Sequence, residues 1–380
     1  MKLHLVEPVS PLSRAFYGLR EVGSRLRHFK SRWIAKKRSL KLRISAGNEV
    51  LMNYGWMGKS SVSRLPIGGE IKLIPLREKY PERFNDFNLI YLVSSALPPH
   101  AEELVATAKA RGARLVWNQN GIAYPGCYGD FYPWFNLRMI TLRAQADYIF
   151  NQSEFSRISA ERYLGRSVAP SQTCFNPVDT DRFSPSDDRP GETWRILAAG
   201  TSLAFYRTRS ALDTLKELLS RRRNVHLTIA GQFRWRGGPD QVREAMKGLE
   251  KHITILPPFR QEDAPAIYRR ADVLLHTKFH DPCPTVPIEA MSCGIPVVGT
   301  RSGGMPELVP MECGVLVPVS QGWMKDVAGS PSDLADAVEH VMGHRPTMSQ
   351  ASREHAVRSF ELRNWLERHE RVFRQLLDYR

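Results

Sequence analysis

The chain has 380 residues, of which 42% are hydrophobic, and its formal net charge is +15. This length is enough for two domains with separate cores. No apolar run approaches the length of a membrane span, and the charges near the N-terminus do not fit a secretory signal peptide. The five cysteines form no CxxC pair with zinc-ligand spacing, so we expect reduced thiols in a cytoplasmic protein.

Residues 11–44 form a basic segment with eleven Lys or Arg and one acid, Glu21. Phe16, Phe29 and Trp33 recur among the basic residues at helical intervals. A basic amphipathic helix of this kind suits the anionic inner face of a membrane, to which it would attach the protein peripherally. A helix with a solvated basic face fits the segment equally well. Nucleic acid is a weaker third alternative, because no nucleic-acid-binding motif accompanies the charge.

From Leu51 onward, short apolar runs alternate with amphipathic segments, which is the pattern of an α/β domain. One predicted strand ends at Asn120 and Gly121. Asn120 can hydrogen-bond a sugar or an acceptor there, or it can simply tolerate a left-handed turn before the glycine. Ser153 has the position and chemistry of a helix N-cap. Strands are predicted over residues 71–76, 88–95, 113–121 and 146–152, and a helix over residues 100–112.

Residues 184–192 are rich in Pro, Gly, Ser and Asp, a composition that favours an interdomain linker. We therefore expect a first domain over residues 1–185 and a second over residues 186–355. The second domain begins with a predicted strand that ends at Gly200. The last residues, 356–380, are helical by periodicity.

The stretch most informative about function lies between residues 276 and 309. A predicted buried strand is followed by an acidic loop, a helix over about residues 286–293, a second buried strand and a glycine loop. A βαβα unit of this kind binds ligands at the carboxyl ends of its strands. The spacing therefore predicts a ligand site in this stretch.

Two acids and two glycines supply the chemistry of that site. Asp281 and Glu289 lie eight residues apart, and their carboxylates can accept hydrogen bonds from sugar hydroxyls. The free amides of the helix N-terminus suit a diphosphate. Gly303 and Gly304 would let the backbone approach that phosphate closely.

The string EAMSCGIPVV, followed by GG-x-PE, resembles the E-x7-E region of retaining glycosyltransferase family 4, the glycosyl transferases group 1. The resemblance implies the GT-B fold: two Rossmann-like domains facing across a cleft, with a C-terminal helix that crosses back to the first domain. It implies that Glu289 binds the nucleotide ribose. It also implies that Asp281 binds the donor sugar together with the amides near Thr285 and Val286. Asp281 stands where the family has Glu, so its carboxylate lies one methylene further back.

The resemblance further implies a basic residue about seven places after Gly200 that binds the donor diphosphate. Arg207 is the best match and Arg209 the alternative, while Thr201 stands where the family has another basic residue. The planar guanidinium of an arginine can bind two phosphate oxygens together. The predicted catalytic residues are Asp281 and Arg207; the donor-binding ones are Glu289, Thr285, Val286, Gly200, Thr201, Arg209, Gly303, Gly304 and Met305; and Asn120 and Gly121 lie on the acceptor or donor-sugar side.

These features predict a glycosyltransferase that moves a hexose-type sugar from a nucleotide-diphosphate donor to a glycan or lipid-linked acceptor. The resemblance implies retention of the anomeric configuration, in the synthesis of surface polysaccharide or glycolipid. No cofactor or metal is required, because Arg207 and the helix amides would stabilise the leaving diphosphate. Two alternatives remain. One is a sugar-nucleotide epimerase or hydrolase on the same fold, and the other is a non-catalytic basic protein that binds anionic membrane or nucleic acid.

Overall fold

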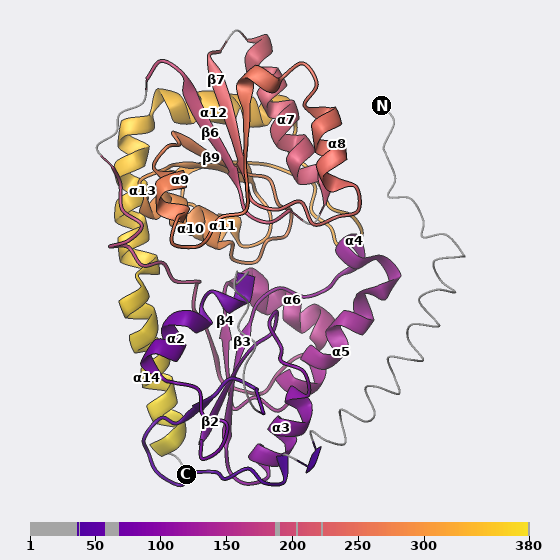
Figure 1. Cartoon of the computed structure of the whole chain (residues 1–380), viewed down its shortest axis with the longest axis vertical. Coiled ribbons are helices and arrows are strands. Elements are labelled where there is room, and N and C mark those ends of the chain that lie inside the picture. The colour runs from indigo at the N-terminus through magenta and orange to yellow at the C-terminus, as the bar shows by residue number, and fades with distance from the viewer. Residues whose placement is uncertain are drawn as a thin grey trace.

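The computed structural model describes residues 36–37, 39–57, 68–186, 191–202, 204–221 and 223–378. Two parallel sheets lie one above the other along the long axis of the molecule, each in its own domain (Figure 1). Each sheet has a separate hydrophobic cluster on either face. The predicted fold of two Rossmann-like domains is therefore confirmed.

The first domain is built on a five-stranded parallel sheet in the order β1-β2-β3-β4-β5. Its strands are short apolar runs, and all five residues of β2 are buried, as expected for a strand covered on both faces. Ser153 caps α6 as predicted, because its side chain accepts a hydrogen bond from Ser156 N. The elements are β1 (Met52–Asn53), α2 (Leu73–Lys79), β2 (Leu89–Val93), α3 (Ala101–Lys109), β3 (Arg114–Gln119), α4 (Pro125–Tyr128), α5 (Tyr132–Arg143), β4 (Tyr148–Asn151), α6 (Glu154–Leu164) and β5 (Ser171–Thr173), with 3-10 turns at Gly68–Glu70 and Gly129–Phe131.

The strand predicted over residues 71–76 is wrong, because the chain there enters helix α2. Leu73 and Leu76, three residues apart, are both buried, whereas Ile74 between them is 37% exposed. Burial at a spacing of three is helical, whereas a strand would alternate. Pro75 is tolerated because it lies in the first turn, where its missing N–H would have no helical partner. An apolar run this short does not separate the two possibilities.

The second domain has six parallel strands in the order β11-β10-β9-β6-β7-β8. The strand order reverses between β6 and β9, and ligands bind at the carboxyl ends of the strands at such a point. The elements are β6 (Trp194–Ala199), α7 (Phe205–Ser220), β7 (Val225–Ala230), α8 (Gly238–Ala245), β8 (Ile253–Leu256), α9 (Ala264–Tyr268), β9 (Val273–His276), α10 (Thr285–Ser292), β10 (Val297–Thr300), α11 (Met305–Leu308), β11 (Gly314–Val317), α12 (Pro331–Gly343) and α13 (Arg345–Phe360), with a 3-10 turn at Glu250–His252.

The C-terminal helix α14 (Leu362–Asp378) returns to the first domain, as the predicted fold requires (Figure 1). Its side chains Trp365 and Phe373 join the apolar cluster on one face of the first sheet. His369 Nε2 lies 3.0 Å from the hydroxyl of Tyr91 in β2. At the crossing, Leu362 N donates to Val178 O at 2.9 Å, so the outgoing and returning segments lie side by side.

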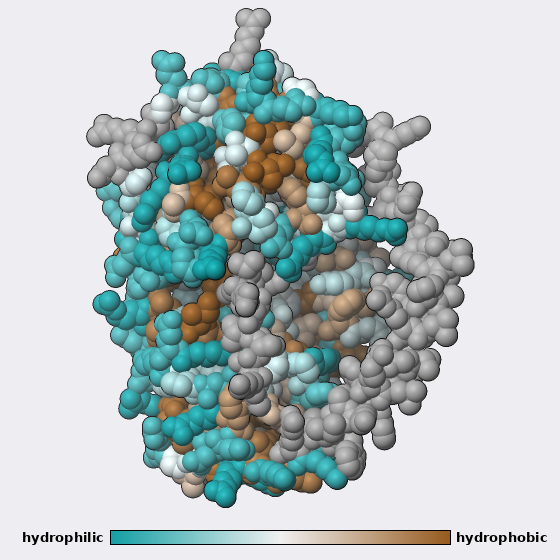
Figure 2. Space-filling model, viewed as in Figure 1, coloured by the Kyte–Doolittle hydropathy of each residue, from teal (hydrophilic) through white to brown (hydrophobic). Residues whose placement is uncertain are grey.

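Figure 2 shows hydrophilic side chains over much of one face of both domains, with apolar ones between them. None of the helices in the described ranges is long and apolar enough to cross a lipid bilayer. Of the basic segment 11–44, the structure describes residues 36–37 and 39–44, so the membrane-binding prediction for that segment lies mostly outside the described residues.

Candidate active site

Two glycines bring the carboxyl end of β6 against the N-terminus of α10. Gly200 and Gly231 have φ angles of +99° and +139°, in the region that favours glycine. A Cβ on Gly231 would lie 2.5 Å from Gly200 O, and a Cβ on Gly200 would lie 3.3 Å from the side chain of Val286. The backbone after β6 therefore lies directly beside the first turn of α10, at the point where the strand order reverses.

The first turn of α10 has unpaired amides. Within the described part of the chain, no acceptor receives a hydrogen bond from the amides of Thr285 and Val286, and Pro284 before them provides no side-chain cap. Both residues are only half-buried, so a ligand can reach them. Unpaired amides with the helix dipole behind them form a site for an anion.

Arg207 lies in the first turn of α7, beside this edge. Its Nη1 donates to Thr201 O at 2.9 Å, while its buried Nε has no hydrogen-bond partner among the described residues. Thr277, directly after β9, donates its hydroxyl to Arg207 O at 3.0 Å. Burial lowers the pKa of the guanidinium, and the neighbouring charge of Asp281 raises it in part. An arginine with an unpaired buried N–H can bind phosphate oxygens.

Arg209, the alternative to Arg207, lies away from this edge. Its side chain is 53% exposed, and its Nε donates to Asp213 Oδ2 at 2.7 Å, one turn along the helix. Two residues along an α-helix point to different sides, which explains why only one of the two arginines can reach the site. The structure thus places Arg207, and not Arg209, beside Asp281.

Asp281 forms an ion pair at the site. Lys278 Nζ lies 2.9 Å from its Oδ2, and His276 Nε2 lies 3.6 Å from the same atom, too far for a hydrogen bond. Burial raises the pKa of Asp281, but Lys278 and His276 outweigh burial and hold the pKa well below its usual range. Burial also lowers the pKa of His276. Asp281 is therefore an ionised acceptor, as sugar hydroxyls would require.

Glu289 lies one turn further along α10 and is buried. Gln261 Nε2 donates to its Oε1 at 2.6 Å, and the hydroxyl of Tyr268 donates to its Oε2 at 2.7 Å. Burial raises the pKa of Glu289, and these two hydrogen bonds lower it. Each carboxylate oxygen keeps a further lone pair, so a ribose hydroxyl could still be bound. The ribose contact stays a prediction.

The glycine loop before α11 packs against the loop that carries Asp281. Gly304 N donates to Asp281 O at 2.9 Å, and Met305 N donates to a carbonyl of its own loop at 3.3 Å. A Cβ on Gly303 would lie 2.4 Å from Asp281 O, and one on Gly304 would lie 2.0 Å from Pro282 O. The backbone at these two glycines therefore lies close to the loop that carries Asp281. Of the three predicted amides, those of Gly304 and Met305 are already bonded, and the predicted contact of this loop with the diphosphate stays a prediction.

On the first-domain side, a buried lysine organises the polar groups. Lys72 Nζ donates to Asn118 Oδ1 at 2.9 Å, to Asn120 Oδ1 at 2.8 Å and to Gln152 Oε1 at 3.3 Å. Burial lowers the pKa of Lys72 to about 8. Asn120 Nδ2 donates to Ser95 Oγ at 2.6 Å. Both ends of the Asn120 amide are thus engaged within the domain, although this residue lies at the predicted end of β3.

Several contacts join the two domains around the cleft. The carboxylate of Glu307 accepts hydrogen bonds from the first two amides of α6, at 2.6 and 2.8 Å. Asn176 Nδ2 donates to Cys283 O at 2.6 Å. A Cβ on Gly121 would lie 3.5 Å from Pro282. Gly121 therefore lies opposite the loop that carries the predicted acid.

Residues 318–329, between β11 and α12, form a clasp loop that reaches the first domain. Its Trp323 ring stacks on Phe155 of α6, with centroids 5.5 Å apart and an interplanar angle of 13°. Asp326 in the same loop accepts a hydrogen bond from the hydroxyl of Tyr124 at 2.7 Å. Burial raises the pKa of Asp326. The clasp loop thus adds an acid near the cleft.

Sequence reasoning missed Lys72, Lys278 and the clasp loop. Lys278 could have been found, because a basic residue three places before Asp281 is placed to pair with it. No sequence feature marked Lys72 as a site residue, because it lies within residues 71–76, which were wrongly predicted to be a strand. The clasp loop has no motif that ties it to the other domain. Among the described residues, no three His, Cys, Asp or Glu side chains are grouped to hold a metal ion.

Comparison with known proteins defines the class of the second domain. Residues 195–344 match the family model of the glycosyl transferases group 1, so the chain contains a domain of that class. D-inositol 3-phosphate glycosyltransferase of Mycolicibacterium smegmatis is 31% identical over 188 residues, which cover 47% of this chain and 42% of that protein. The enzyme of the same name from Mycobacterium sp. (strain JLS) is 29% identical over 188 residues, covering 47% and 41%. The chain thus matches less than half of the length of these relatives.

Solved structures resemble the whole chain more broadly. HepE of Anabaena, in complex with UDP-glucose, has a TM-score of 0.66 and 16% identity, covering 87% of this chain and 99% of that chain. Sucrose-phosphate synthase of Thermosynechococcus elongatus has a TM-score of 0.60 and 17% identity, covering 81% and 77%. At this level of identity the likeness concerns the fold. The predicted GT-B fold is confirmed.

Proposed function

We propose that this protein is a glycosyltransferase that transfers a hexose-type sugar from a nucleotide-diphosphate donor to a glycan or lipid-linked acceptor. The proposal rests on one observation. Where the strand order reverses, the buried unpaired N–H of Arg207 lies near the carboxylate of Asp281 and the free amides that begin α10. The group 1 domain and the structural likeness to HepE, which was solved with UDP-glucose, support it.

Loss of the nucleotide diphosphate leaves positive charge at the anomeric carbon and negative charge on the leaving phosphate. Arg207 and the amides of Thr285 and Val286 supply hydrogen-bond donors for that negative charge. We propose that the acceptor hydroxyl attacks the face from which the diphosphate departs. A diphosphate oxygen can then take the acceptor proton, and the configuration is retained without a protein nucleophile.

The two acids have separate roles in this scheme. Asp281, held ionised by Lys278, accepts a hydrogen bond from a hydroxyl of the donor sugar. Glu289, oriented by Gln261 and Tyr268, accepts one from the ribose. Asp281 thus acts on the group that is transferred, whereas Glu289 acts on the part of the donor that is released.

The acceptor and its pathway are also part of the proposal. The basic composition of residues 11–44 supports peripheral attachment at the cytoplasmic face of a membrane. A lipid-linked acceptor would be presented there, as in the assembly of surface polysaccharides or glycolipids.

The test is incubation of the full chain with a panel of UDP- and GDP-sugars, with released nucleotide diphosphate as the readout and the melting temperature as a measure of binding. We expect one nucleotide sugar to raise the melting temperature and to release its nucleotide when an acceptor is added. A converted sugar nucleotide with no release would indicate an epimerase, and free sugar without an acceptor would indicate a hydrolase. No shift with any nucleotide would favour a non-catalytic binding protein.

A further inference from the structure

Residues 128–140 expose an apolar surface on the first domain. Among the described residues, six of the fourteen exposed large hydrophobic side chains lie in this stretch, including every exposed aromatic one. Phe131, Trp134 and Phe135 leave 56%, 63% and 56% of their area exposed. A cluster of this kind marks an interaction site, whereas single exposed apolar residues do not. We define the α4–α5 surface as Tyr128, Phe131, Trp134, Phe135, Leu137 and Ile140.

Helix α5 is held so that this apolar side faces outward. Asn136 on the inner side donates to Ala123 O and accepts from Ala123 N, both at 2.9 Å. Arg143, also on the inner side, donates to Gly165 O at 2.6 Å. The inner side also buries Met139 and Leu142, so α5 has apolar residues on its inner and its outer side, whereas an ordinary surface helix has them on one side. Rotating the helix to hide its apolar face would leave these buried hydrogen bonds broken.

The rim of the α4–α5 surface is basic. Arg162 and Arg166 are exposed, and no acidic side chain of the described residues forms an ion pair with either. Asp130 is the one acid between residues 124 and 145. With a net charge of +15, the chain as a whole is also strongly cationic. The guanidinium of Arg162 lies over the rings of Tyr163 and Trp323, at 5.7 and 5.8 Å, so exposed aromatic rings lie near arginines that have no acidic partner among the described residues.

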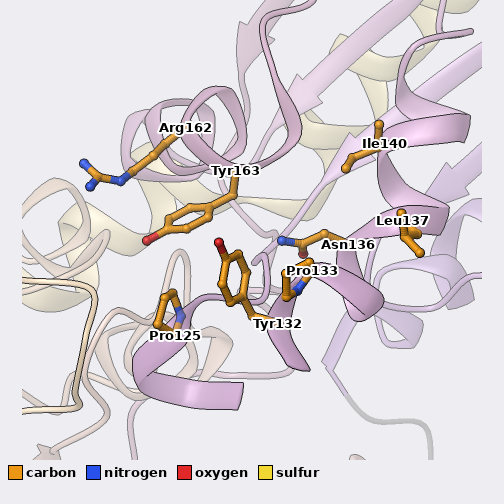
Figure 3. Close-up of a pocket in the computed structure, with 8 residues that line it drawn as sticks. All are labelled: Pro125, Tyr132, Pro133, Asn136, Leu137, Ile140, Arg162 and Tyr163. Atoms are coloured by element: carbon orange, nitrogen blue, oxygen red, sulfur yellow. The ribbon is translucent and has the colours of Figure 1, made fainter. Parts of the chain in front are cut away.

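A cavity of about 420 Å³ adjoins this surface, between α5 and α6. Figure 3 shows the hydroxyl of Tyr132 pointing toward the ring of Tyr163, with Arg162 at the edge of the cavity and directed away. Leu137 and Ile140 of the α4–α5 surface line its opposite side. The lining of the cavity thus changes from polar groups on one side to apolar groups on the other, as a phospholipid changes from its head group to its acyl chains.

The surface lies close to the cleft. Helix α4 lies at the level where the two domains meet, and α5 leads away along the first domain (Figure 1). Gly126 in α4 donates its amide to Trp323 O of the clasp loop at 2.7 Å. Gly121, which lies opposite the loop that carries Asp281, is only seven residues before Tyr128. A molecule held at the α4–α5 surface is therefore near the proposed transfer site.

We infer that the α4–α5 surface docks on an anionic phospholipid bilayer. Trp134 and Phe135 insert at the level of the head groups, where aromatic rings are favoured, and Arg162 and Arg166 face the lipid phosphates. A second copy of the chain is a poorer occupant, because two equally cationic rims would face one another. The inference concerns docking alone, so it stands or falls separately from the proposed transfer reaction.

The test is sedimentation of the full chain with vesicles of phosphatidylcholine, with and without 30% phosphatidylglycerol, at low and high salt. The variant replaces Trp134→Ser and Phe135→Ser together. Its matched control replaces Ile255→Ser and Met311→Ser, which are exposed apolar residues of the second domain. A third variant replaces Arg162→Gln and Arg166→Gln. Melting temperature and far-UV circular dichroism check that each variant is folded.

We expect the wild type to bind the anionic vesicles, the aromatic variant to lose at least about tenfold in binding, and the control to stay within about twofold of the wild type. The arginine variant should lose binding to anionic vesicles only, and salt should weaken wild-type binding without abolishing it. Wild-type binding by the aromatic variant, or no vesicle binding at all, would overturn the inference. A wild-type dimer that the aromatic substitutions convert to monomer would also overturn it, because the occupant would then be a second copy.

Discussion

The two sheets end at the same cleft but use their polar groups in opposite ways. At the second-domain edge, Arg207 keeps a buried N–H without a partner, and the amides that begin α10 have no acceptor among the described residues. At the first-domain edge, Lys72 directs its ammonium group to three amide oxygens, from Asn118, Asn120 and Gln152. The second-domain edge therefore has hydrogen-bond donors left for a ligand, whereas the donor of the first-domain edge is bonded within its own domain.

This difference separates a binding edge from a supporting edge. A buried donor without a partner costs about 1–3 kcal/mol, and a ligand bound beside Asp281 would complete the hydrogen bonds of Arg207. A polar network that is satisfied internally makes its surroundings rigid instead. We therefore expect the donor to be bound mainly by the second domain. The acceptor would then contact the loop after Gly121 and not the amide group of Asn120.

The largest expected effect is that of Arg207→Ala. It should lower turnover on the order of 10²- to 10³-fold, as does the loss of one donor that stabilises a transition state. Arg209→Ala is the matched control and should change turnover by less than about twofold, because Arg209 pairs with Asp213 at the surface. The measurement is the rate of nucleotide diphosphate release. If Arg209→Ala loses turnover while Arg207→Ala keeps it, the arginine that binds the diphosphate is Arg209, two residues further along the chain.

Lys72→Met tests the supporting edge through the pH dependence of stability. Burial lowers the pKa of Lys72 from 10.5 to about 8, so between these values the unfolded chain binds more protons than the folded one. The free energy of unfolding of the wild type should therefore rise with pH across this window. The rise attributable to Lys72 is roughly 3 kcal/mol in all, since one pKa unit corresponds to about 1.4 kcal/mol.

Lys72→Met should lack that rise, and Lys79→Met, which removes a surface partner of Glu370, should keep it. Urea unfolding of the three proteins from pH 7 to about 10.5 makes the comparison. Parallel curves for the wild type and Lys72→Met would mean that Lys72 titrates normally and that its edge is solvated.

Asp281→Asn tests the binding edge at the sugar. It removes the charge paired with Lys278 and should lower turnover by about 30-fold, or about 2 kcal/mol, while the affinity for the nucleotide diphosphate that the panel identifies changes by less than about twofold. Because the pKa of Asp281 is held well below its usual range, the wild-type rate should show no titration of this group between pH 5 and 8. Isothermal titration with that nucleotide diphosphate, beside turnover, separates the two effects. An equal loss in both would place Asp281 at the nucleotide instead.

The fold could be predicted largely because its strands are continuous buried runs separated by helices. Such runs identify a parallel sheet covered on both faces, as in β2 and β9. The prediction failed over residues 71–76, where a short apolar run has no periodicity that separates strand from helix. For the basic segment 11–44, only the composition of the sequence is informative. Composition does not show what the segment binds or packs against.

The candidate site was predictable where spacing along one element decides position. Arg207 and Asp281 were each found by their spacing from a predicted strand, and the structure shows that these two strands are neighbours in the sheet. The packing of Gly303 and Gly304 against the loop that carries Asp281 was not predictable, because a sequence shows that a glycine permits close approach but not which group approaches it. Lys72 was missed because its partners come from two other segments of the first domain, at the ends of β3 and β4. Long-range contacts of that kind leave no pattern in a single sequence.

The smallest expected effect is that of Glu289→Gln, which tests whether this acid binds ligand or only holds α10 in place. The substitution keeps the shape but replaces an acceptor oxygen by an NH2 group. That group must face the donor of either Gln261 or Tyr268, so the melting temperature should fall whatever the role of Glu289. Stability alone therefore cannot decide.

The ligand affinity of Glu289→Gln can decide, because the ribose is present both in the nucleotide diphosphate and in the nucleotide sugar. If Glu289 binds the ribose, Glu289→Gln should weaken both ligands by the same factor, about tenfold, or about 1.4 kcal/mol. Tyr268→Phe is the matched control: it removes a hydrogen bond to Oε2 but leaves the acceptor in place, so it should lower stability with little change in affinity. Equal affinities for the wild type and Glu289→Gln would make Glu289 a structural residue of α10. The binding edge would then consist of Arg207, Asp281 and the helix amides alone.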